Sequence, residues 1–236
     1  LEQRRHGIFL TKIFNPAGLP VLERCWIPSE ELDSQKLEAD IPFNAAGKKA
    51  APGGPLLLKK EEDLWLFAEP LYPAPKLVIA GAGHVGGAVA HLGKLLDFEV
   101  TVMDDRPDLA GRITEACDVI VDDISESLRR FPLTEDSYVV IVTRGHKHDA
   151  DALKACLGRG AAYIGMIGSR RKISLMHKDF LAKKWASKDQ LDAVHAPIGL
   201  DIGSTTVQEI AVSIAAQLIK VRAKKNINRE EKWFGP

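Results

Sequence analysis

The sequence predicts an α/β fold built on a doubly wound parallel sheet, and two observations carry this prediction. From residue 76 onward, short apolar runs alternate with segments whose apolar residues recur at helical spacing. A glycine-rich turn, GAGHVG at residues 81–86, directly follows the first apolar run and opens the first helical segment. Together they indicate a Rossmann-like domain with helices on both faces of its sheet.

The expected elements follow in chain order. Strands are predicted in KLVIAGAG, FEVTVMDD, CDVIVDD, YVVIVTRG and AAYIGMIGS, and helices in VGGAVAHLGKLL and near residues 125–130, 149–157 and 170–185. A last helix over about 206–223 starts with a capping box formed by Thr206 and Glu209. Its apolar residues on one face are Ile210, Ile214, Leu218 and Val221.

Residues 1–73 are expected to form a small β-rich segment. GIFLTKIF at 7–14 is predicted to be a strand and residues 55–71 one or two more, with a loop rich in Gly, Ala and Pro between them. YPAP at 72–75 is predicted to be a rigid link. The expected organisation is a β-rich segment over 1–73, a Rossmann-like domain over 74–225 and a frayed tail over 226–236.

The composition excludes several classes of protein. The 236 residues include 32 Lys and Arg against 32 Asp and Glu, so the formal net charge is zero and favours neither nucleic acid nor an anionic membrane. No run approaches the ~20 apolar residues of a transmembrane helix, and no signal peptide pattern is present.

The scattered cysteines Cys25, Cys117 and Cys156 are expected to be reduced thiols, which favours the cytoplasm. Because the chain begins at Leu1 rather than Met, we expect further sequence before it.

The glycine turn is predicted to bind a phosphate group. Gly81 permits the tight turn, Gly83 lets a phosphate approach the backbone, and Gly86 allows close packing of helix on strand, so that the helix N-terminus faces the anion. About 20 residues further on, Asp104 ends the second strand and would accept a hydrogen bond from a ribose hydroxyl. Three alternatives stay open: Arg106 would serve a 2′-phosphate, Asp104 would only cap the short helix that follows, or the glycines serve packing alone.

A second motif, TRGHKHD at 143–149, follows the fourth strand at the edge where open α/β sheets bind ligands. His146 and His148 alternate, so they would share one face of an extended loop, close to Arg144 and Asp149. This set could contact an anion or a cofactor, hold a metal or move protons. The alternative is a polar loop in which Asp149 is the N-cap of the next helix.

A third motif, GMIGSRRK at 165–172, follows the fifth strand at the same edge. Ser169 is a predicted N-cap, which places Arg170, Arg171 and Lys172 at the positive end of a helix dipole, where each cation costs roughly 0.3–1 kcal/mol. A bound anion would offset that cost. The alternative is that the three side chains point into solvent.

A fourth motif, HAPIGLDIGS at 195–204, precedes the last helix and is neither a helix nor a regular strand. Pro197, Gly199 and Gly203 fix a turn-rich path between His195 and Asp201. A structural loop and a functional loop explain this motif equally well.

Taken together, the motifs resemble the XdhC/CoxI family, the xanthine dehydrogenase accessory factors. GAGHVG, VTVMDDRPD, YVVIVTRGHKHD, YIGMIGSRRK and HAPIGLDIGS…EIAVSI occur in family order and at family-like spacing over about residues 68–222. The resemblance implies a Rossmann domain that binds molybdenum cofactor, a pterin with a terminal phosphate and in bacteria often a nucleotide. It further implies help in sulfuration of the cofactor with a cysteine desulfurase, and delivery to a molybdenum hydroxylase apoenzyme such as xanthine dehydrogenase.

One feature departs from the family. Its members usually carry an N-terminal domain with a glycine-rich, acid-containing motif and often a cysteine, and residues 1–73 contain no such motif. Cys25 lies in LERCWIP, outside any glycine-rich context. The departure concerns the N-terminal part of the accessory apparatus and leaves the predicted Rossmann fold unchanged.

For a cofactor-handling factor we expect a set of cofactor contacts and no metal ligand, while the catalytic residues stay unknown. A phosphate would be bound by Gly81, Gly83, His84 and Gly86, and a ribose or pterin donor by Asp104. The pterin side would be contacted by Arg144, His146 and His148, and an anionic group by Ser169, Arg170 and Arg171. The wall of the binding site would be completed by His195 and Asp201.

Two other functions compete with a cofactor-handling factor. An NAD(P)-dependent oxidoreductase would use His146, His148 or His195 as general acid or base, and a nucleotide-sensing module would carry no chemistry. The apolar face of the last helix fits either a homodimer interface or core packing.

Overall fold

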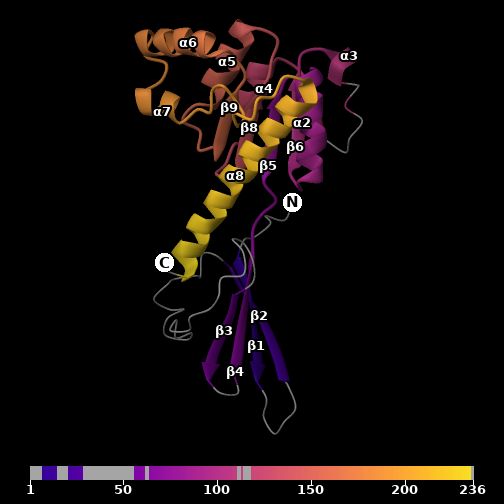
Figure 1. Cartoon of the computed structure of the whole chain (residues 1–236), viewed down its shortest axis with the longest axis vertical. Coiled ribbons are helices and arrows are strands. Elements are labelled where there is room, and N and C mark those ends of the chain that lie inside the picture. Colours follow the sequence, from indigo (N-terminus) through magenta and orange to yellow (C-terminus); the bar gives the residue numbers. More distant parts are fainter. Residues whose placement is uncertain are drawn as a thin grey trace. The chain divides into compact units, whose positions relative to one another are not determined.

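The computed structural model of the chain describes residues 7–14, 21–28, 56–61, 64–110, 113 and 118–234. The chain divides into two compact units. The larger unit is residues 74–221, and the smaller one combines residues 1–73 with residues 222–236. Figure 1 labels the helices and strands of both units.

The larger unit is built on a five-stranded parallel sheet with the strand order β7-β6-β5-β8-β9. This arrangement confirms the predicted fold class. The chain runs outward from β5 through β6 to β7 and then returns to the other side of β5 for β8 and β9, so the order reverses between β5 and β8. The strands are β5 (Lys76–Ala80), β6 (Glu99–Asp104), β7 (Asp118–Val121), β8 (Ser137–Ile141) and β9 (Tyr163–Met166).

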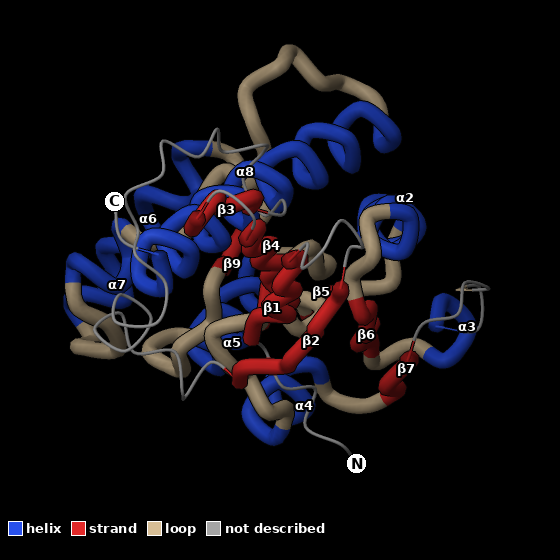
Figure 2. The backbone as a smooth tube through the Cα atoms, turned by 90° about the horizontal axis from the view of Figure 1, so that it is seen from below, coloured by secondary structure: helices blue, strands red, loops and turns tan. Residues whose placement is uncertain are grey.

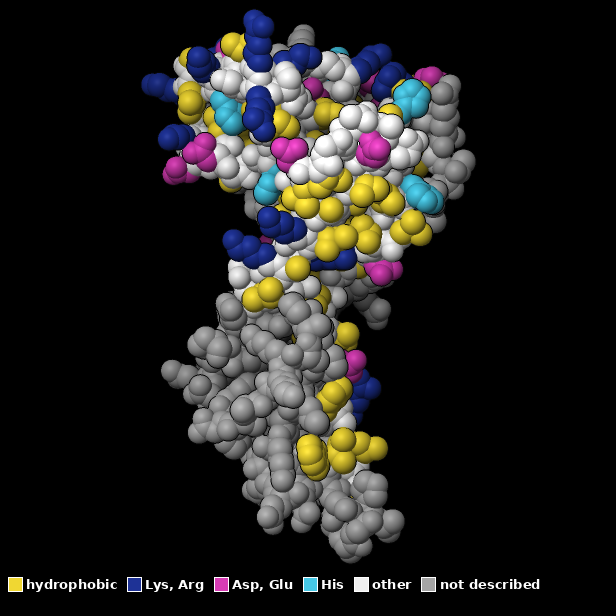
Figure 3. Space-filling model, viewed as in Figure 1, with side chains coloured by type: hydrophobic (Ala, Val, Ile, Leu, Met, Phe, Trp, Pro, Cys, Tyr) yellow, Lys and Arg dark blue, Asp and Glu magenta, His cyan; other side chains and the backbone are white. Residues whose placement is uncertain are grey.

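Helices cover both faces of this sheet. In the view of Figure 2, α2 and α8 lie on one side of the strands and α4 and α5 on the other. On the face drawn in Figure 3, hydrophobic side chains gather over the region of α8 and α2. The helices are α2 (His84–Leu95), α3 (Pro107–Ala110), α4 (Ile124–Arg130), α5 (His146–Cys156), α6 (Arg170–Ala182), α7 (Lys188–Asp192) and α8 (Val207–Phe234).

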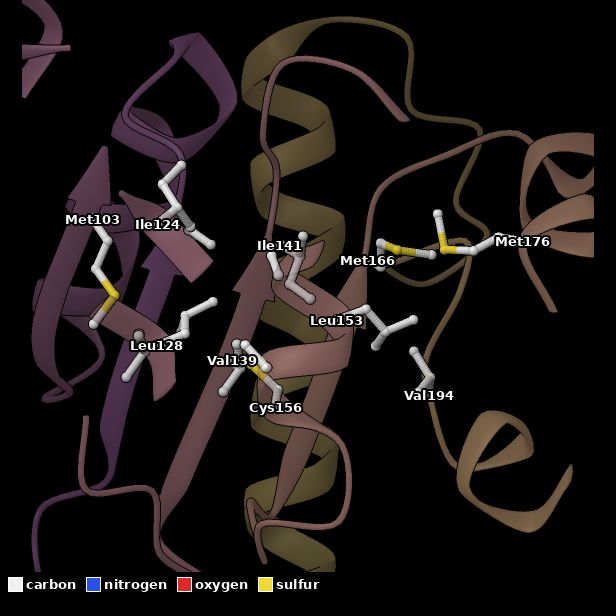
Figure 4. Packing of buried hydrophobic residues seen from close by; sticks show 14 of the residues in the cluster. Met103, Ile124, Leu128, Val139, Ile141, Leu153, Cys156, Met166, Met176 and Val194 are labelled. Carbon is white, nitrogen blue, oxygen red and sulfur yellow. The ribbon is translucent and has the colours of Figure 1, made fainter. Parts of the chain in front are cut away.

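Successive side chains of the central strand β5 point to opposite faces of the sheet, and the core is accordingly divided into two clusters. Leu77 and Ile79 of β5 pack with α2 and α8, whereas Val78 and Ala80 pack with α4, α5 and α6. All four side chains are fully buried. Figure 4 shows the second cluster, in which helix residues such as Leu153 lie against strand residues of β8 and β9. Burial on both faces explains why these strands appear in the sequence as continuous apolar runs.

Helix α8 confirms its predicted start and corrects its predicted end. The Oγ1 atom of Thr206 accepts from the backbone N–H of Glu209 at 3.3 Å, and Glu209 Oε2 accepts from the N–H of Thr206 at 2.9 Å, which completes the capping box. The expected end near residue 223 is wrong, because the helix continues to Phe234, so residues 226–234 of the expected frayed tail are helical. No Gly or Pro interrupts residues 224–234, and the first such residues are 235 and 236. No helix of the described residues has the length and apolar character that crossing a membrane requires.

The smaller unit contains an antiparallel sheet with the order β2-β1-β4-β3. The expected strands at 7–14 and 55–71 are confirmed as β1 (Gly7–Phe14), β3 (Leu56–Glu61) and β4 (Leu64–Leu71). Strand β2 (Val21–Pro28) is absent from the sequence-based expectations, because an exposed edge strand needs no alternation of apolar and polar residues. The expected loop over 43–55 lies outside the described residues, as does Cys117.

Gly86→Ala is expected to destabilise the larger unit by about 1–3 kcal/mol, because a Cβ at this position would lie 1.9 Å from the carbonyl oxygen of Gly81. The matched variant Gly87→Ala is expected to be neutral or to gain up to about 1 kcal/mol, since its Cβ would meet the Cδ1 atom of Ile113 at an ordinary 3.7 Å. Urea unfolding followed by circular dichroism measures both. Equal stability of the two variants would contradict the packing argument.

Candidate functional site

The glycine turn lies where the strand order reverses, at the carboxyl ends of β5 and β8. The backbone N–H of Gly81 donates to the carbonyl of Met103 at 2.8 Å, and that of Val142 donates to the carbonyl of Ala80 at 2.9 Å. Gly81 has a φ of 118°, and a Cβ there would lie 2.5 Å from the carbonyl oxygen of Val142. Only glycine fits this position, so the turn holds the start of α2 directly against the neighbouring strand end.

Gly83 is different, because neither its backbone nor its neighbours require a glycine. Its φ is −68°, which any residue adopts, and a Cβ would meet no atom of the described residues within 4 Å. Gly83 is the N-cap of α2, and it provides no side-chain hydrogen bond to the first turn. The space over Gly83 and the N–H groups of that turn therefore suit an anionic group, which is the arrangement that phosphate-binding turns use.

A cavity of about 700 Å³ opens beside this turn. Its size falls within the ~300–1,000 Å³ range of ligand pockets. His84 lies exposed in its wall, and Arg106 is the charged group that lines it. The other lining residues are Ala82, Gly83, Gly87, Ala88, Leu109, Ile113, Val207 and Gln208.

Asp104 ends β6 with its carboxylate 1% exposed and already engaged. Its Oδ2 accepts from the N–H of Ala82 at 2.6 Å and from Nη2 of Arg106 at 2.9 Å, while its Oδ1 accepts from Nε of Arg106 at 2.8 Å. Burial raises the pKa of Asp104, but the hydrogen bonds from Arg106 and Ala82 lower it more, so the pKa lies below its ordinary 3.8. The backbone N–H of Arg106 also donates to Oδ1 at 3.0 Å, so all four acceptor positions of the carboxylate are used and Asp104 can bond a ribose only by giving up one of these bonds.

A row of alternating charges crosses the strand ends beside the turn. Arg106 Nε lies 3.7 Å from Asp105 Oδ1, and Asp105 Oδ2 accepts from Nη2 of Arg144 at 3.2 Å. Arg144 follows β8 and Asp105 follows β6, so this ion pair spans the end of β5 between them. Because both side chains are more than a third exposed, the ion pair orients Arg144 without adding much stability.

The second motif adopts a structure different from the predicted one. Helix α5 begins at His146 with Gly145 as its N-cap, so the expectation that Asp149 is the N-cap is wrong. His146 and His148 belong to this helix rather than to an extended loop, which corrects the extended-loop prediction. Asp149 lies in the first turn, is 7% exposed, and accepts from Thr143 Oγ1 at 2.6 Å. The side chains of His146 and Lys147 lie outside the described part, and His148 is exposed.

A second, smaller cavity of about 210 Å³ lies between the second and third motifs. It opens at the carboxyl ends of β8 and β9, beside the starts of α5 and α6. Its lining residues are Thr143, Gly145, Asp149, Met166, Ile167, Gly168, Lys172, Ile173 and Met176. The structure thus brings residues of two separate motifs to one site.

The start of α6 confirms the predicted N-cap. Ser169 Oγ accepts from the backbone N–H of Lys172 at 3.4 Å, and the helix begins at Arg170. Arg170 and Arg171 are exposed, and Lys172 lines the smaller cavity. Figure 3 shows Lys and Arg side chains gathered over the region of α6. None of the three cations has an ion-pair partner in the described part of the chain.

The fourth motif is anchored to the sheet and to α8. The backbone of His195 pairs with Ile164 and Met166 at 2.9 and 3.0 Å, and its ring stacks on Tyr163 with centroids 4.7 Å apart. Burial and the nearby Lys220 lower the pKa of His195. These contacts give His195 a structural role. Asp201 is exposed, and it lines neither cavity.

Gln217 fixes the middle of this motif. Its Oε1 accepts from Tyr163 Oη at 2.6 Å and from the N–H of Gly199 at 2.9 Å, and its Nε2 donates to the carbonyl of Gly199 at 3.2 Å. The described residues contain no cluster of three or more His, Cys, Asp or Glu that would hold a metal.

The fold and the site define the chain as a Rossmann-type protein with an open glycine turn at the switch point of its sheet. The XdhC Rossmann domain is the family that matches, over residues 77–218. The chain belongs to this family, which confirms the resemblance recognised in its motifs.

Two curated relatives and one solved structure are similar to parts of the chain. Uncharacterized protein YqeB of Escherichia coli K12 is 31% identical over 151 residues, which cover 63% of this chain and 27% of that protein. A probable xanthine dehydrogenase subunit of Bacillus subtilis 168 is 26% identical over 161 residues, which cover 67% of this chain and 46% of that protein. The chain therefore spans less than half the length of these relatives.

The solved structure is the crystal structure of a xanthine dehydrogenase from Bacillus halodurans. It matches with a TM-score of 0.73 and 22% identity, and the match covers 98% of this chain and 67% of that one. At this identity the likeness shows a shared fold.

Asp104→Asn is expected to lower stability at neutral pH by about 1–3 kcal/mol, because it weakens the bidentate pair with Arg106. The folded-state pKa of Asp104 is depressed, so its contribution is complete above pH 3.8 and is lost as the pH falls below that value. The stability difference between wild type and variant should therefore shrink on acidification. Urea unfolding across this pH range measures it, and a pH-independent difference would contradict the assignment.

Proposed function

We propose that this chain binds molybdenum cofactor and helps to deliver it to the apoenzyme of a molybdenum hydroxylase such as xanthine dehydrogenase. The observation that carries the proposal is the cavity of about 700 Å³ beside Gly83, where a phosphate has both room and donors. Membership of the XdhC family and the likeness to a probable xanthine dehydrogenase subunit support the choice of cofactor and client.

The phosphate end of the cofactor would lie over Gly83. The first-turn N–H groups of α2 would donate to its oxygens, and Arg106 in the same cavity would neutralise part of its charge. Asp104 holds the Arg106 guanidinium through two hydrogen bonds, so this cation is positioned before the ligand arrives. His84 in the cavity wall would add a donor.

Sulfuration of the cofactor is proposed to need a partner cysteine desulfurase. Cys156 is fully buried, and burial raises the pKa of its thiol to about 12, so it stays a neutral thiol and is a poor sulfur carrier. Cys25 is exposed and belongs to the smaller unit. The burial of Cys156 agrees with a role of the chain in binding and delivery, with sulfur supplied from outside.

The homodimer stays a prediction. Its supporting observation is that Leu95, Val212 and Ile219 are 66%, 50% and 41% exposed. They lie on α2 and α8, over which hydrophobic side chains gather in Figure 3.

Gly83→Val is expected to abolish binding of the phosphate-bearing cofactor while leaving the fold intact, because its side chain would occupy the open space over the turn. The matched Gly83→Ala variant fills less of that space and should lose less affinity. The measurement is the pterin content of protein purified without air from a molybdenum-replete host, read as fluorescence after denaturation and oxidation. Circular dichroism confirms folding of both variants.

Calorimetric titration with NAD and NADP separates the proposal from its competitors. Pterin in the wild-type protein without nicotinamide binding would support the accessory function. Tight nicotinamide binding without pterin would overturn it in favour of an oxidoreductase or a nucleotide sensor. Unchanged pterin content in Gly83→Val would show that the turn serves packing alone.

A further inference from the structure

We infer that the outer side of α6 and the segment after it form a docking surface for an acidic protein, with the exposed side chains of Leu175, Leu181 and Trp185 as its apolar centre. Residues 170–188, together with Lys154 of α5, make up this α6 surface. The surface is inferred from charge, exposure and packing. The identity of the acidic protein as the client apoenzyme rests on the proposed function.

The charges of the α6 surface are almost all of one sign. Residues 170–188 contain seven Lys and Arg against one Asp, although the whole chain has 32 Lys and Arg and 32 Asp and Glu. Asp179 pairs with Lys183 at 2.8 Å. The other six cations have no ion-pair partner in the described part of the chain, and they are Arg170, Arg171, Lys172, Lys178, Lys184 and Lys188. Like charges gathered in one place repel one another, and carboxylates of a partner would relieve that repulsion.

Large apolar side chains are exposed among these cations. Leu175, Leu181 and Trp185 are 55%, 44% and 39% exposed. Figure 3 shows hydrophobic and basic side chains intermixed over the region of α6. Protein interfaces have an apolar or aromatic centre within a polar rim, and Trp and Arg are enriched in them. The α6 surface has this composition.

Trp185 is held in place before any partner arrives. Its ring meets the fully buried ring of Phe180 edge to face, with centroids 5.4 Å apart. The Nζ atoms of Lys154 and Lys183 lie 3.8 and 4.5 Å from its centroid, in cation–π contact. Docking on an aromatic side chain that is already ordered costs little conformational entropy.

The packing of α6 favours a protein partner over a membrane. A helix that lies in a bilayer interface buries its apolar face among the lipids. The apolar face of α6 is already buried in the core, and it consists of Ile173, Met176 and Phe180. The opposite side of the helix carries the exposed residues Arg171, Leu175 and Lys178 at helical spacing, so it combines two cations with one leucine.

The leucines also favour a protein over a nucleic acid. Phosphates would pair with the cations of the α6 surface, but they would leave Leu175 and Leu181 without an apolar partner. A protein surface with carboxylates around an apolar pocket matches both kinds of side chain.

The probe is the xanthine dehydrogenase apoenzyme from the same genome, made in a host without molybdenum cofactor and immobilised on a sensor. Association and dissociation rates of the full chain are measured at low and high salt. A DNA duplex and phosphatidylserine vesicles serve as two further probes. We expect the wild type to bind the apoenzyme and neither of the other two.

Lys178→Glu is expected to slow association with the apoenzyme about three- to tenfold at low salt, and the difference should fade as salt screens the charges. Lys224→Glu is the matched control, since it reverses an exposed lysine within α8, outside the α6 surface. It should keep the wild-type association rate.

Leu175→Ala is expected to speed dissociation at least about fivefold, because it removes an apolar contact at the centre of the surface. Alanine preserves the helix, since it is the best helix former. Ile202→Ala is the matched control, because Ile202 has the same 55% exposure and lies outside the α6 surface. Circular dichroism confirms that all four variants fold.

A wild type that does not bind the apoenzyme, or equal binding by the wild type, Lys178→Glu and Leu175→Ala, overturns the docking surface. Binding to DNA or to vesicles that Lys178→Glu abolishes, without binding to the apoenzyme, also overturns it and assigns the cations to that other ligand. The pterin content of the same preparations tests the proposed function separately. Apoenzyme binding that depends on both residues, in a protein without pterin, supports the surface and counts against cofactor binding.

Discussion

The close approach of helix α2 to the end of strand β5 is the constraint on which the site depends. The Cα of Gly86 lies so near the carbonyl oxygen of Gly81 that no Cβ fits between them. Because the helix can come this close, its N-terminus lies at the carboxyl edge of the sheet, next to the end of β8. The phosphate-sized space over Gly83 and the contact between the turn and Thr143 both follow from this packing.

Two buried carboxylates lie at this edge of the sheet, and both already accept hydrogen bonds from neighbouring side chains. Asp104 holds Arg106 in the larger cavity, and Asp149 is held by the hydroxyl of Thr143 in the smaller one. A buried charge without partners is costly, so these hydrogen bonds are what allow carboxylates to lie beside ligand cavities. The larger cavity is lined by the cation Arg106, whereas the smaller one is lined by both the carboxylate of Asp149 and the cation Lys172, which makes the two chemically distinct.

Much of the site was predictable from short sequence patterns, whereas the rest depends on contacts between residues that are distant in the sequence. The glycine turn, the N-cap Ser169 and the capping box of α8 have short-range signatures, and the structure confirms them. The start of α5 was predicted three residues too late, because Gly145 caps it without a polar side chain and offers no sequence signal. The engagement of Asp104 was also not predictable, although Arg106 two positions later provided a hint.

The sequence by itself determined the parallel sheet, its order of elements and the gathering of three motifs at one edge, because apolar periodicity and glycine turns act over a few residues. Only the tertiary structure decided which members of those motifs share a cavity. Lys172 rather than Arg170 or Arg171 lines the cavity of Asp149, and His195 stacks on Tyr163 instead of lining either cavity. The physical reason is that cavity walls are formed by residues from different strands and helices, whose approach is set by core packing.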